Sequence, residues 1–233
     1  MKGSKVLKFL GNGSCFNTKF GNNSAYHFDT STNKLFLIDC GEDVFKKLCE
    51  TNLLEKAQKI DVLITHLHTD HAGSLPSLIF FCKFVKNIVP TVIYPNTYVM
   101  KQYLSITGVS DDLYNLIKPE EYEDYKIESI RQQHVIDIDA YGYIMTIDNK
   151  RIFYSGDSKT LNYLILNDFL AGHFDYFYHD ISRYETPAHM NIKELAKLVP
   201  EEKRRKVTCM HLDDEKTLKM AESLGFKVAV VHI

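Results

Sequence analysis

The stretch Thr65-His-Leu-His-Thr-Asp-His-Ala-Gly-Ser74 follows directly after the apolar run Ile60-Asp-Val-Leu-Ile64, which predicts a buried β-strand that ends near residue 65. Its metal-binding residue types are His66, His68, Asp70 and His71. Imidazole and carboxylate groups are the usual protein ligands of zinc and other first-row metals. Four such groups buried without partners would cost free energy, so a purely structural role is disfavoured. The stretch therefore predicts a metal site at the end of a strand.

The spacing of these residues also indicates how many ions the site holds. His66 and His68 lie two apart on an extended segment, so their side chains can point the same way. Asp70 and His71 come after the chain turns and can face a second position. One tetrahedral ion would not take four ligands from so short a loop, so a two-metal site is the simplest explanation.

Composition limits the kind of protein. The 233 residues predict a single domain, 1–233, and the apolar fraction of 45% and charged fraction of 25% are ordinary for a globular protein. A net charge of −2 makes nucleic acid an unfavourable partner. No apolar run is long enough to cross a membrane, and the polar start, residues 1–5, is no signal peptide. The five cysteines are widely spaced and form no Cys-x-x-Cys pair, which predicts reduced thiols and a cytoplasmic location.

Strands and helices alternate along the chain without a Pro/Gly-rich linker. Apolar runs predict strands at Val6–Leu10, Ser24–Phe28, Lys34–Asp39, Val62–Thr65, Thr91–Tyr94, Lys126–Gln132, Tyr141–Ile147, Arg151–Tyr154, Phe174–Tyr178, Lys206–Met210 and Lys227–Val231. Helical spacing predicts helices at Glu42–Leu54, Leu75–Val85, Asn191–Leu198 and Asp214–Leu224, the last followed by Gly225 as a C-cap. This pattern favours an α/β or α+β sandwich, with helices packed outside the sheets.

Three further metal-binding residue types follow predicted strands. His134 comes after residues 127–133, Asp157 after 151–156, and His211 after 206–210. Gly156 would let the backbone approach the site closely. These residues supply the additional ligands that two ions need.

At this point the sequence resembles the metallo-β-lactamase-fold hydrolases, whose motif His-x-His-x-Asp-His stands here at residues 66–71. The other segments that carry the resemblance are 9–14, 21–24, 37–41, 155–157 and His211. The resemblance implies an αββα sandwich with one ion held by His66, His68 and His134. It also implies a second ion held by Asp70, His71 and His211, with Asp157 bridging the two. The ions would be divalent, with zinc expected and manganese as an alternative. Asp70 is counted among the catalytic residues as well as among the ligands, and Asp39 is expected behind the ligands.

The segment His179-Asp-Ile-Ser-Arg-Tyr-Glu-Thr-Pro-Ala-His189 resembles the ribonuclease Z-like phosphodiesterase branch of that family. Members carry an acidic residue after a late strand and a histidine about ten residues on. Asp180 and His189 match these positions, although aspartate replaces the usual glutamate. The resemblance implies that His189 is the general acid, or a contact of the phosphate, and that Asp180 orients it. A plain loop histidine is the alternative.

The chain departs from the tRNA-processing members of that branch. They carry a long arm for tRNA, whereas here only 22 residues separate His134 from Asp157. This difference favours a small phosphodiester, and the chain most resembles phage anti-Pycsar cyclic nucleotide phosphodiesterases. That resemblance implies cyclic CMP or UMP as substrate, a homodimer, and the host cytoplasm as location if a phage encodes the chain. An RNA endonuclease, a lactonase and a non-catalytic metal-stabilised binding protein remain alternatives.

Weaker signals have structural interpretations. Residues 11–14 lack the lysine of a phosphate-binding loop and predict a tight turn. The basic run 203–206 is expected at a solvated helix end. His27, His173 and His232 are expected to be structural.

Overall fold

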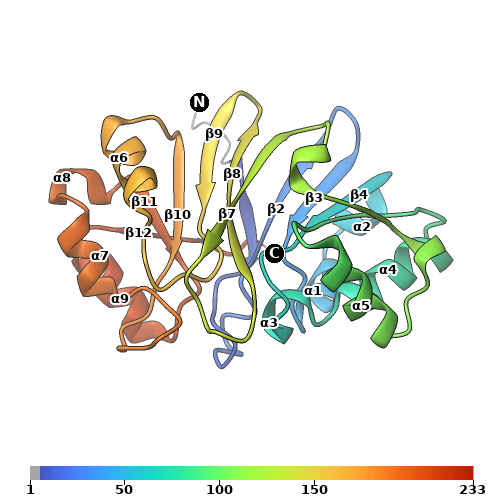
Figure 1. The fold of residues 1–233 in the computed structure, drawn as a ribbon, viewed down its shortest axis with the longest axis horizontal. Coiled ribbons are helices and arrows are strands. Elements are labelled where there is room, and N and C mark those ends of the chain that lie inside the picture. The colour runs from blue at the N-terminus through green and yellow to red at the C-terminus, as the bar shows by residue number, and fades with distance from the viewer. Residues whose placement is uncertain (1–5, 233) are drawn as a thin grey trace.

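Two six-stranded sheets lie face to face in the computed structural model of the protein, and helices cover the outer face of each (Figure 1). The structure describes residues 6–232. The expectation that the chain start is no signal peptide concerns residues 1–5, which lie outside that range. Among the described residues, no helix has the length and apolar character needed to span a membrane.

The first sheet is built by the N-terminal half of the chain. Its strands, in their spatial order, are β1 (Lys8–Gly11), β2 (Ser24–Asp29), β3 (Lys34–Ile38), β4 (Lys59–Leu63), β5 (Thr91–Ile93) and β6 (Asn115–Ile117). β1, β2 and β3 pair antiparallel, and β3 to β6 pair parallel. The accompanying helices are α1 (Val44–Glu50), α2 (Leu53–Lys56), α3 (Thr69–Ala72), α4 (Leu75–Phe84) and α5 (Thr97–Ile106), with 3₁₀ turns η1 (Asp111–Leu113) and η2 (Pro119–Glu121).

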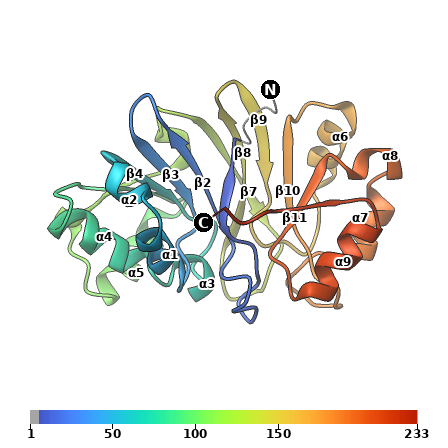
Figure 2. The same ribbon diagram turned by 180° about the vertical axis from the view of Figure 1, so that it is seen from behind.

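The second sheet is built by the C-terminal half in the same style. Its strands are β7 (Lys126–Gln132), β8 (Ala140–Ile147), β9 (Lys150–Tyr154), β10 (Tyr176–Asp180), β11 (Val207–Met210) and β12 (Lys227–Val228), arranged in that order across the sheet. β7, β8 and β9 pair antiparallel, and β9 to β12 pair parallel. The helices on this side are α6 (Tyr163–Ala171), α7 (Ile192–Leu198), α8 (Glu201–Arg204) and α9 (Glu215–Ser223). Seen from behind, the layers run helix, sheet, sheet, helix (Figure 2). The expected αββα sandwich is confirmed.

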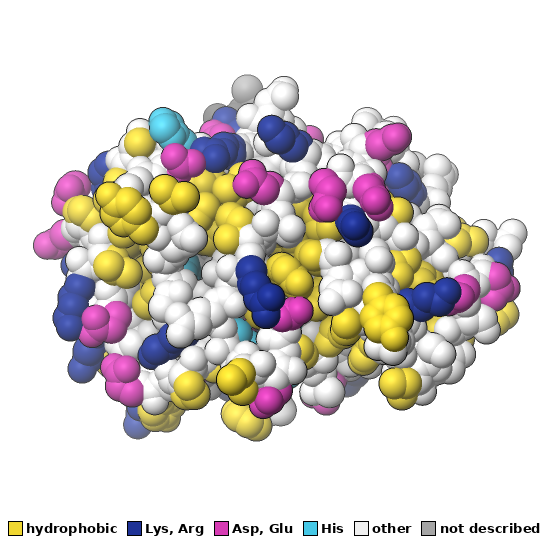
Figure 3. Space-filling model, in the orientation of Figure 1, with side chains coloured by type: hydrophobic (Ala, Val, Ile, Leu, Met, Phe, Trp, Pro, Cys, Tyr) yellow, Lys and Arg dark blue, Asp and Glu magenta, His cyan; other side chains and the backbone are white. Residues whose placement is uncertain are grey.

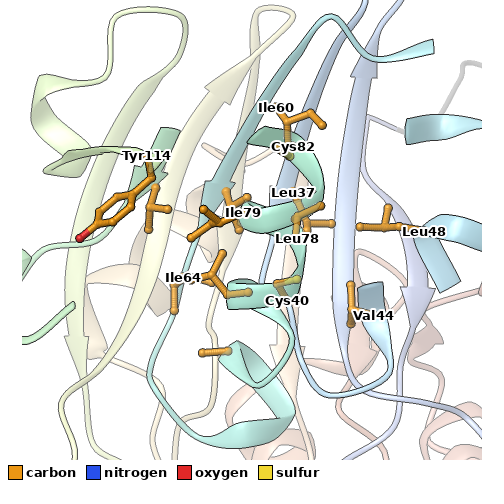
Figure 4. Packing of buried hydrophobic residues seen from close by; sticks show 14 of the residues in the cluster. Leu37, Cys40, Val44, Leu48, Ile60, Ile64, Leu78, Ile79, Cys82 and Tyr114 are labelled. Atoms are coloured by element: carbon orange, nitrogen blue, oxygen red, sulfur yellow. The ribbon is translucent and has the colours of Figure 1, made fainter. Parts of the chain in front are cut away.

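The alternation of side chains on β3 explains the layering. Leu35 and Leu37 point outward into the apolar cluster under the helices, where Leu37 lies among Leu78 and Ile79 of α4 (Figure 4). Phe36 and Ile38 point the opposite way, into the cluster between the two sheets. Successive residues of a strand face opposite sides of a sheet, so an apolar run of this kind is buried on both faces.

The expected helix Glu42–Leu54 is two helices, α1 and α2, and the expectation was wrong at this point. Thr51 breaks the helix because its hydroxyl group competes with the backbone. It donates to the carbonyl of Leu48 at 2.8 Å and accepts from the amide of Leu53 at 3.2 Å. Helices α5 and α6 and strand β6 were not expected, although Asn96 and Asn162 cap the two helices at their N-termini.

Two smaller expectations are confirmed. Gly225 follows α9 with a φ of +90°, the conformation that favours glycine after a helix. The basic run 203–206 lies at the end of α8, as expected, with Arg205 and Lys206 exposed to solvent. Arg204 differs from the rest, because its guanidinium donates to the carbonyls of Ala196, Val199 and Leu224.

Candidate metal centre

The metal-binding residue types meet at one edge of the sandwich, where strands of both sheets end. His66 and His68 follow β4, and Asp70 and His71 lie in the one-turn helix α3. His68 has an extended backbone and is the N-cap of α3. The chain therefore turns between the two pairs, as the spacing predicted.

Three histidines form the triple-histidine cluster, His66, His68 and His134. Nε2 of His66 lies 2.9 Å from Nδ1 of His68, and Nε2 of His134 lies 3.3 Å from that same atom. His134 follows β7, so the cluster joins the two sheets. Nδ1 of His134 lies 2.9 Å from the carbonyl oxygen of Ala188 and would donate to it, which leaves Nε2 free to bind a metal.

A second group, the aspartate cluster, contains Asp70, His71 and His211. Oδ2 of Asp70 lies 3.3 Å from Nε2 of His71 and 3.3 Å from Nε2 of His211. His211 directly follows β11 and has a φ of +58°. A β-carbon makes this conformation unfavourable, and such residues gather at functional sites.

Asp157 lies between the two clusters. Its Oδ1 is 3.4 Å from Nε2 of His71, and its Oδ2 is 3.4 Å from Nε2 of His211. Oδ2 also lies 3.7 Å from Nε2 of His66 and 4.0 Å from Nε2 of His134. Gly156 permits this placement, because a β-carbon there would lie 2.5 Å from the carbonyl oxygen of Tyr141.

The spacing of these atoms fits metal binding. Ligand atoms held about 2.0–2.1 Å from a tetrahedral ion lie roughly 3.3–3.4 Å from one another. Five of the distances given above fall within 0.1 Å of this range. Among the described residues, buried Nε2 of His71 and Oδ1 of Asp157 have no hydrogen-bond partner. A buried polar atom without a partner costs free energy, and a bound cation would remove that cost. The donor set therefore fits a binuclear centre.

The electrostatics of the two clusters differ. Burial, followed by the neighbouring His71, lowers the pKa of His66 well below its usual value, so this imidazole is neutral and able to bind a metal. Burial would raise the pKa of Asp157, but His211 and His71 outweigh it and hold that pKa well below the usual value. Burial would lower the pKa of His71, yet the surrounding carboxylates raise it well above the usual value. A cation in the aspartate cluster would displace the proton that these carboxylates favour.

Asp39 lies behind the ligands, as expected. Its Oδ1 accepts from the amide of Thr65 at 2.8 Å, and its Oδ2 lies 2.9 Å from Nδ1 of His71. The hydroxyl of Thr65 lies 3.1 Å from Nδ1 of His66. Sequence reasoning missed Thr65, because nothing in the motif shows which side chains contact the far side of each imidazole.

His189 and Asp180 form a pair next to the bridging position. Nδ1 of His189 lies 2.9 Å from Oδ2 of Asp180 and 3.8 Å from Oδ2 of Asp157. Burial would lower the pKa of His189, but the hydrogen bond that it donates to Asp180 and the charge of Asp157 raise that pKa to about 9. His189 therefore carries a proton at neutral pH. A neighbouring histidine, His179, was not singled out from sequence, and its Nδ1 lies 2.8 Å from the carbonyl oxygen of Asp180.

The histidines expected to be structural make other contacts. Nδ1 of His27 lies 2.9 Å from the carbonyl oxygen of Val6, and Nδ1 of His173 lies 3.3 Å from Asp168. His232, near the C-terminus, donates its backbone amide to the carbonyl of Phe9.

The chain is similar to proteins of one known family over nearly its whole length. The chain matches the protein family described as Anti-Pycsar protein Apyc1 over residues 5–231. A relative of that name from Bacillus phage BSP38 is 28% identical over an alignment of 233 positions that covers 89% of each chain. One from Paenibacillus xerothermodurans is 27% identical over an alignment of 236 positions that covers 91% of this chain and 89% of the relative. A ribonuclease Z from Pediococcus pentosaceus is 40% identical over 76 residues, covering 31% of this chain and 24% of the relative.

Solved structures share the fold. A diphosphatase of the PhnP family superposes with a TM-score of 0.74 at 16% identity, covering 97% of this chain and 95% of the other. The metallo-β-lactamase-fold protein YhfI from Bacillus subtilis gives 0.72 at 16% identity, covering 95% and 94%. The short form of human tRNase Z gives 0.65 at 15% identity, covering 97% and 96%. These likenesses show that the fold is the metallo-β-lactamase fold.

Proposed function

Because the chain belongs to the Anti-Pycsar protein Apyc1 family, we propose that it is a two-metal phosphodiesterase that hydrolyses 3′,5′-cyclic mononucleotides to linear nucleotides. The resemblance implies cyclic CMP and cyclic UMP, messengers of Pycsar immunity, as substrates. A phage-encoded enzyme of this kind would act in the host cytoplasm.

One observation supports phosphodiester hydrolysis above other reactions of the fold. The proton-carrying His189 lies 3.8 Å from Asp157, the residue placed between the two clusters. Breaking a ribose–phosphate bond produces an alkoxide, which needs a proton to leave. His189 would supply that proton at the metal centre.

Different residues of the chain would have different roles in such a reaction. Two bound divalent ions would lower the pKa of a water and offset charge on the phosphate. Asp157, between the clusters, would fix the spacing of the two positions. Asp70 would be a ligand of the ion in the aspartate cluster and would help to position the attacking water. Asp180 accepts a hydrogen bond from Nδ1 of His189, which leaves Nε2 to donate toward the leaving oxygen.

A small substrate fits the surroundings of the site better than a large RNA. The connection between β7 and β8 is the short loop 133–139, and β8 and β9 form a tight hairpin. Neither forms an arm that could hold tRNA. The net charge of −2 supplies little attraction for a polyanion. These features make an RNA endonuclease a less favoured function than a cyclic nucleotide phosphodiesterase.

The decisive experiment compares kcat/KM on cyclic CMP, UMP, AMP and GMP with cleavage of a precursor tRNA and of a lactone. We expect turnover of the cyclic nucleotides and little cleavage of the tRNA. The His66→Ala variant, purified in the same way, controls for contaminating nucleases. Activity confined to the tRNA or to the lactone would refute the assignment, and binding of cyclic nucleotides without turnover would favour the non-catalytic alternative.

The assembly and the metal are proposals of the same kind. We expect a homodimer, which sedimentation equilibrium would detect, and zinc in both positions, which elemental analysis would identify.

A further inference from the structure

Two loops that are attached to the metal centre each carry a large apolar side chain that is almost entirely exposed. Phe16 is 94% exposed and Ile136 is 97% exposed. Phe16 lies in the loop 12–23 between β1 and β2, and Ile136 lies in the loop 133–139 between β7 and β8. Both loops extend past the same edge of the sheets as α3 (Figure 1, Figure 2). One exposed apolar residue is ordinary, but two beside one site suggest a binding role.

The loop of Phe16 is attached to the aspartate cluster. The amide of Ser14 donates to the carbonyl of Leu212 at 3.0 Å, and Nδ2 of Asn17 donates to the same oxygen at 3.0 Å. Leu212 is the neighbour of His211 in the chain. Phe16 lies between the two attached residues, at most about 7 Å of chain from Ser14. Its ring is therefore held close to the aspartate cluster.

The same loop is fixed internally by hydrogen bonds around Asn17. The Asn17 amide donates to Ser14 at 2.9 Å, the Phe20 amide to Oδ1 of Asn17 at 3.2 Å, and the Gly21 amide to the Asn17 carbonyl at 3.1 Å. A ring presented by a fixed loop loses little conformational entropy when a ligand binds. Phe16 is thus presented to solvent by a fixed backbone.

The electrostatics of Cys15 agree with the attachment of this loop beside the aspartate cluster. Its thiol is half-buried, and burial, followed by the charges of Asp70 and Asp157, raises the pKa of Cys15 to about 11. The loop therefore lies within electrostatic range of one ligand and of the bridging position.

Ile136 flanks the other cluster. It lies two residues after His134, a member of the triple-histidine cluster. The two loops that are attached to the two metal clusters thus each carry one exposed apolar side chain. Both side chains are uncharged, so the part of a ligand that they would contact should be neutral.

We propose that Phe16 is the residue on which the nucleobase of the substrate stacks, with Ile136 limiting the opposite side of the same position. This rests on the proposed function, because a nucleobase lies one ribose ring away from the phosphate that the metal centre would hold. A base is flat and apolar on both faces, and stacking on an aromatic ring tolerates every base. Phe16 would therefore strengthen binding of all cyclic nucleotides and select weakly among them.

The first test is Phe16→Ala, assayed on cyclic CMP and on the methyl riboside 3′,5′-cyclic phosphate, which lacks a base. Removing one stacking ring should raise KM for cyclic CMP about 5- to 150-fold and leave kcat unchanged. KM for the base-free substrate should not change. The matched control is Phe84→Ala, since Phe84 is 71% exposed and ends α4, about 15 Å along that helix from its start beside the centre. An equal KM rise on both substrates, or no rise on either, would overturn the proposal.

The second test does not need turnover. The chain has no tryptophan, so Phe16→Trp introduces a single fluorescent reporter. A phosphorothioate analogue of cyclic CMP should quench it, and the base-free phosphate should not. Quenching in a protein that hydrolyses no cyclic nucleotide would support the base position and refute the proposed function. Turnover without quenching would refute the base position alone. If neither turnover nor quenching is seen, both the base position and the proposed function are refuted. If Phe16→Ala instead converts a dimer to a monomer at unchanged KM, Phe16 is a subunit contact and the proposal fails.

Discussion

Oδ2 of Asp39 lies 2.9 Å from Nδ1 of His71, and neither side chain has any exposed surface. Asp39 has a φ of +63°, directly after β3, so its backbone is held in an unfavourable conformation to make this contact. The contact fixes the ring of His71 with Nε2 facing Asp70 and Asp157. The orientation of one ligand is thus set from the end of the neighbouring strand β3, by a residue that would not touch the metal.

Replacing Asp39 should therefore weaken metal binding without removing a ligand. Losing such a supporting carboxylate typically costs about 10- to 100-fold in metal affinity. We expect this loss in Asp39→Ala, and a smaller one in Asp39→Asn, which keeps the acceptor but not the charge. Competition with a fluorescent chelator measures the affinity. Asp61→Asn is the control, because Asp61 is equally buried but accepts its hydrogen bond from Tyr122, away from the ligands. Unchanged metal affinity in both Asp39 variants would exclude the supporting role of Asp39.

The two clusters predict two ions per chain. His66→Ala should lose the ion of the triple-histidine cluster and His211→Ala that of the aspartate cluster, so each variant should retain about one. Elemental analysis after purification without chelator gives the stoichiometry. A wild-type content near zero would contradict the whole interpretation of the site.

Asp157→Ala should abolish nearly all turnover while the chain still folds. A carboxylate placed between two ions fixes their separation, and that separation determines the nucleophile. Circular dichroism and steady-state kinetics are measured together. Asp168→Ala is the control, because it removes a partly exposed carboxylate that pairs with Arg151, and it should leave the rate unchanged. Near-normal turnover in a folded Asp157→Ala variant would show that Asp157 is not a ligand of the metal centre.

His189→Ala should keep its metal and lose about 10²- to 10⁴-fold in kcat on cyclic nucleotides. Bis-p-nitrophenyl phosphate releases a stable phenolate that needs no proton, so this variant should hydrolyse it at close to the wild-type rate. A similar loss on both substrates would argue that His189 contacts the phosphate. A fall in metal content would make His189 a ligand and put the assignment of His211 in doubt.

The pH profile of the wild type tests the same proton. The pKa of His189 is raised to about 9, so the ring is protonated at neutral pH and loses its proton as the pH rises. A general acid works only when protonated, so kcat on cyclic nucleotides should decline on the alkaline side. Bound cations repel an imidazolium, so the decline should come at or below pH 9. His189→Ala should lack it.

The ligand positions could be predicted because they depend on local pattern. His66 to His71 follow a strand, and His134, Asp157 and His211 each follow another; strand ends of a two-sheet sandwich meet at a common edge. Contacts between distant residues could not be predicted. Asn17 and Leu212, for example, are 195 positions apart, and no spacing in the sequence brings the loop of Phe16 to His211.

Local errors had local causes. The break at Thr51 depends on its hydroxyl group, which can bond to the backbone either within a helix or at a turn. The sequence shows the residue but not which of these bonds it makes. Helix α6 did carry signals, with Asn162 before it and Gly172 after it at a φ of +86°. Its two ends could have been identified from these residues.

The division of the chain between the sheets has a consequence for how the protein could be cut. All strands of the first sheet precede residue 118, and all strands of the second follow residue 125, so a single break at 118–125 would yield one fragment per sheet. Each cluster takes ligands from both fragments: His66 and His68 with His134, and Asp70 and His71 with His211. The ions would then be the cross-links that join two separate polypeptides. Reassembly of such a split protein would depend on free metal as well as on the apolar cluster between the two sheets, so metal would control association as well as chemistry.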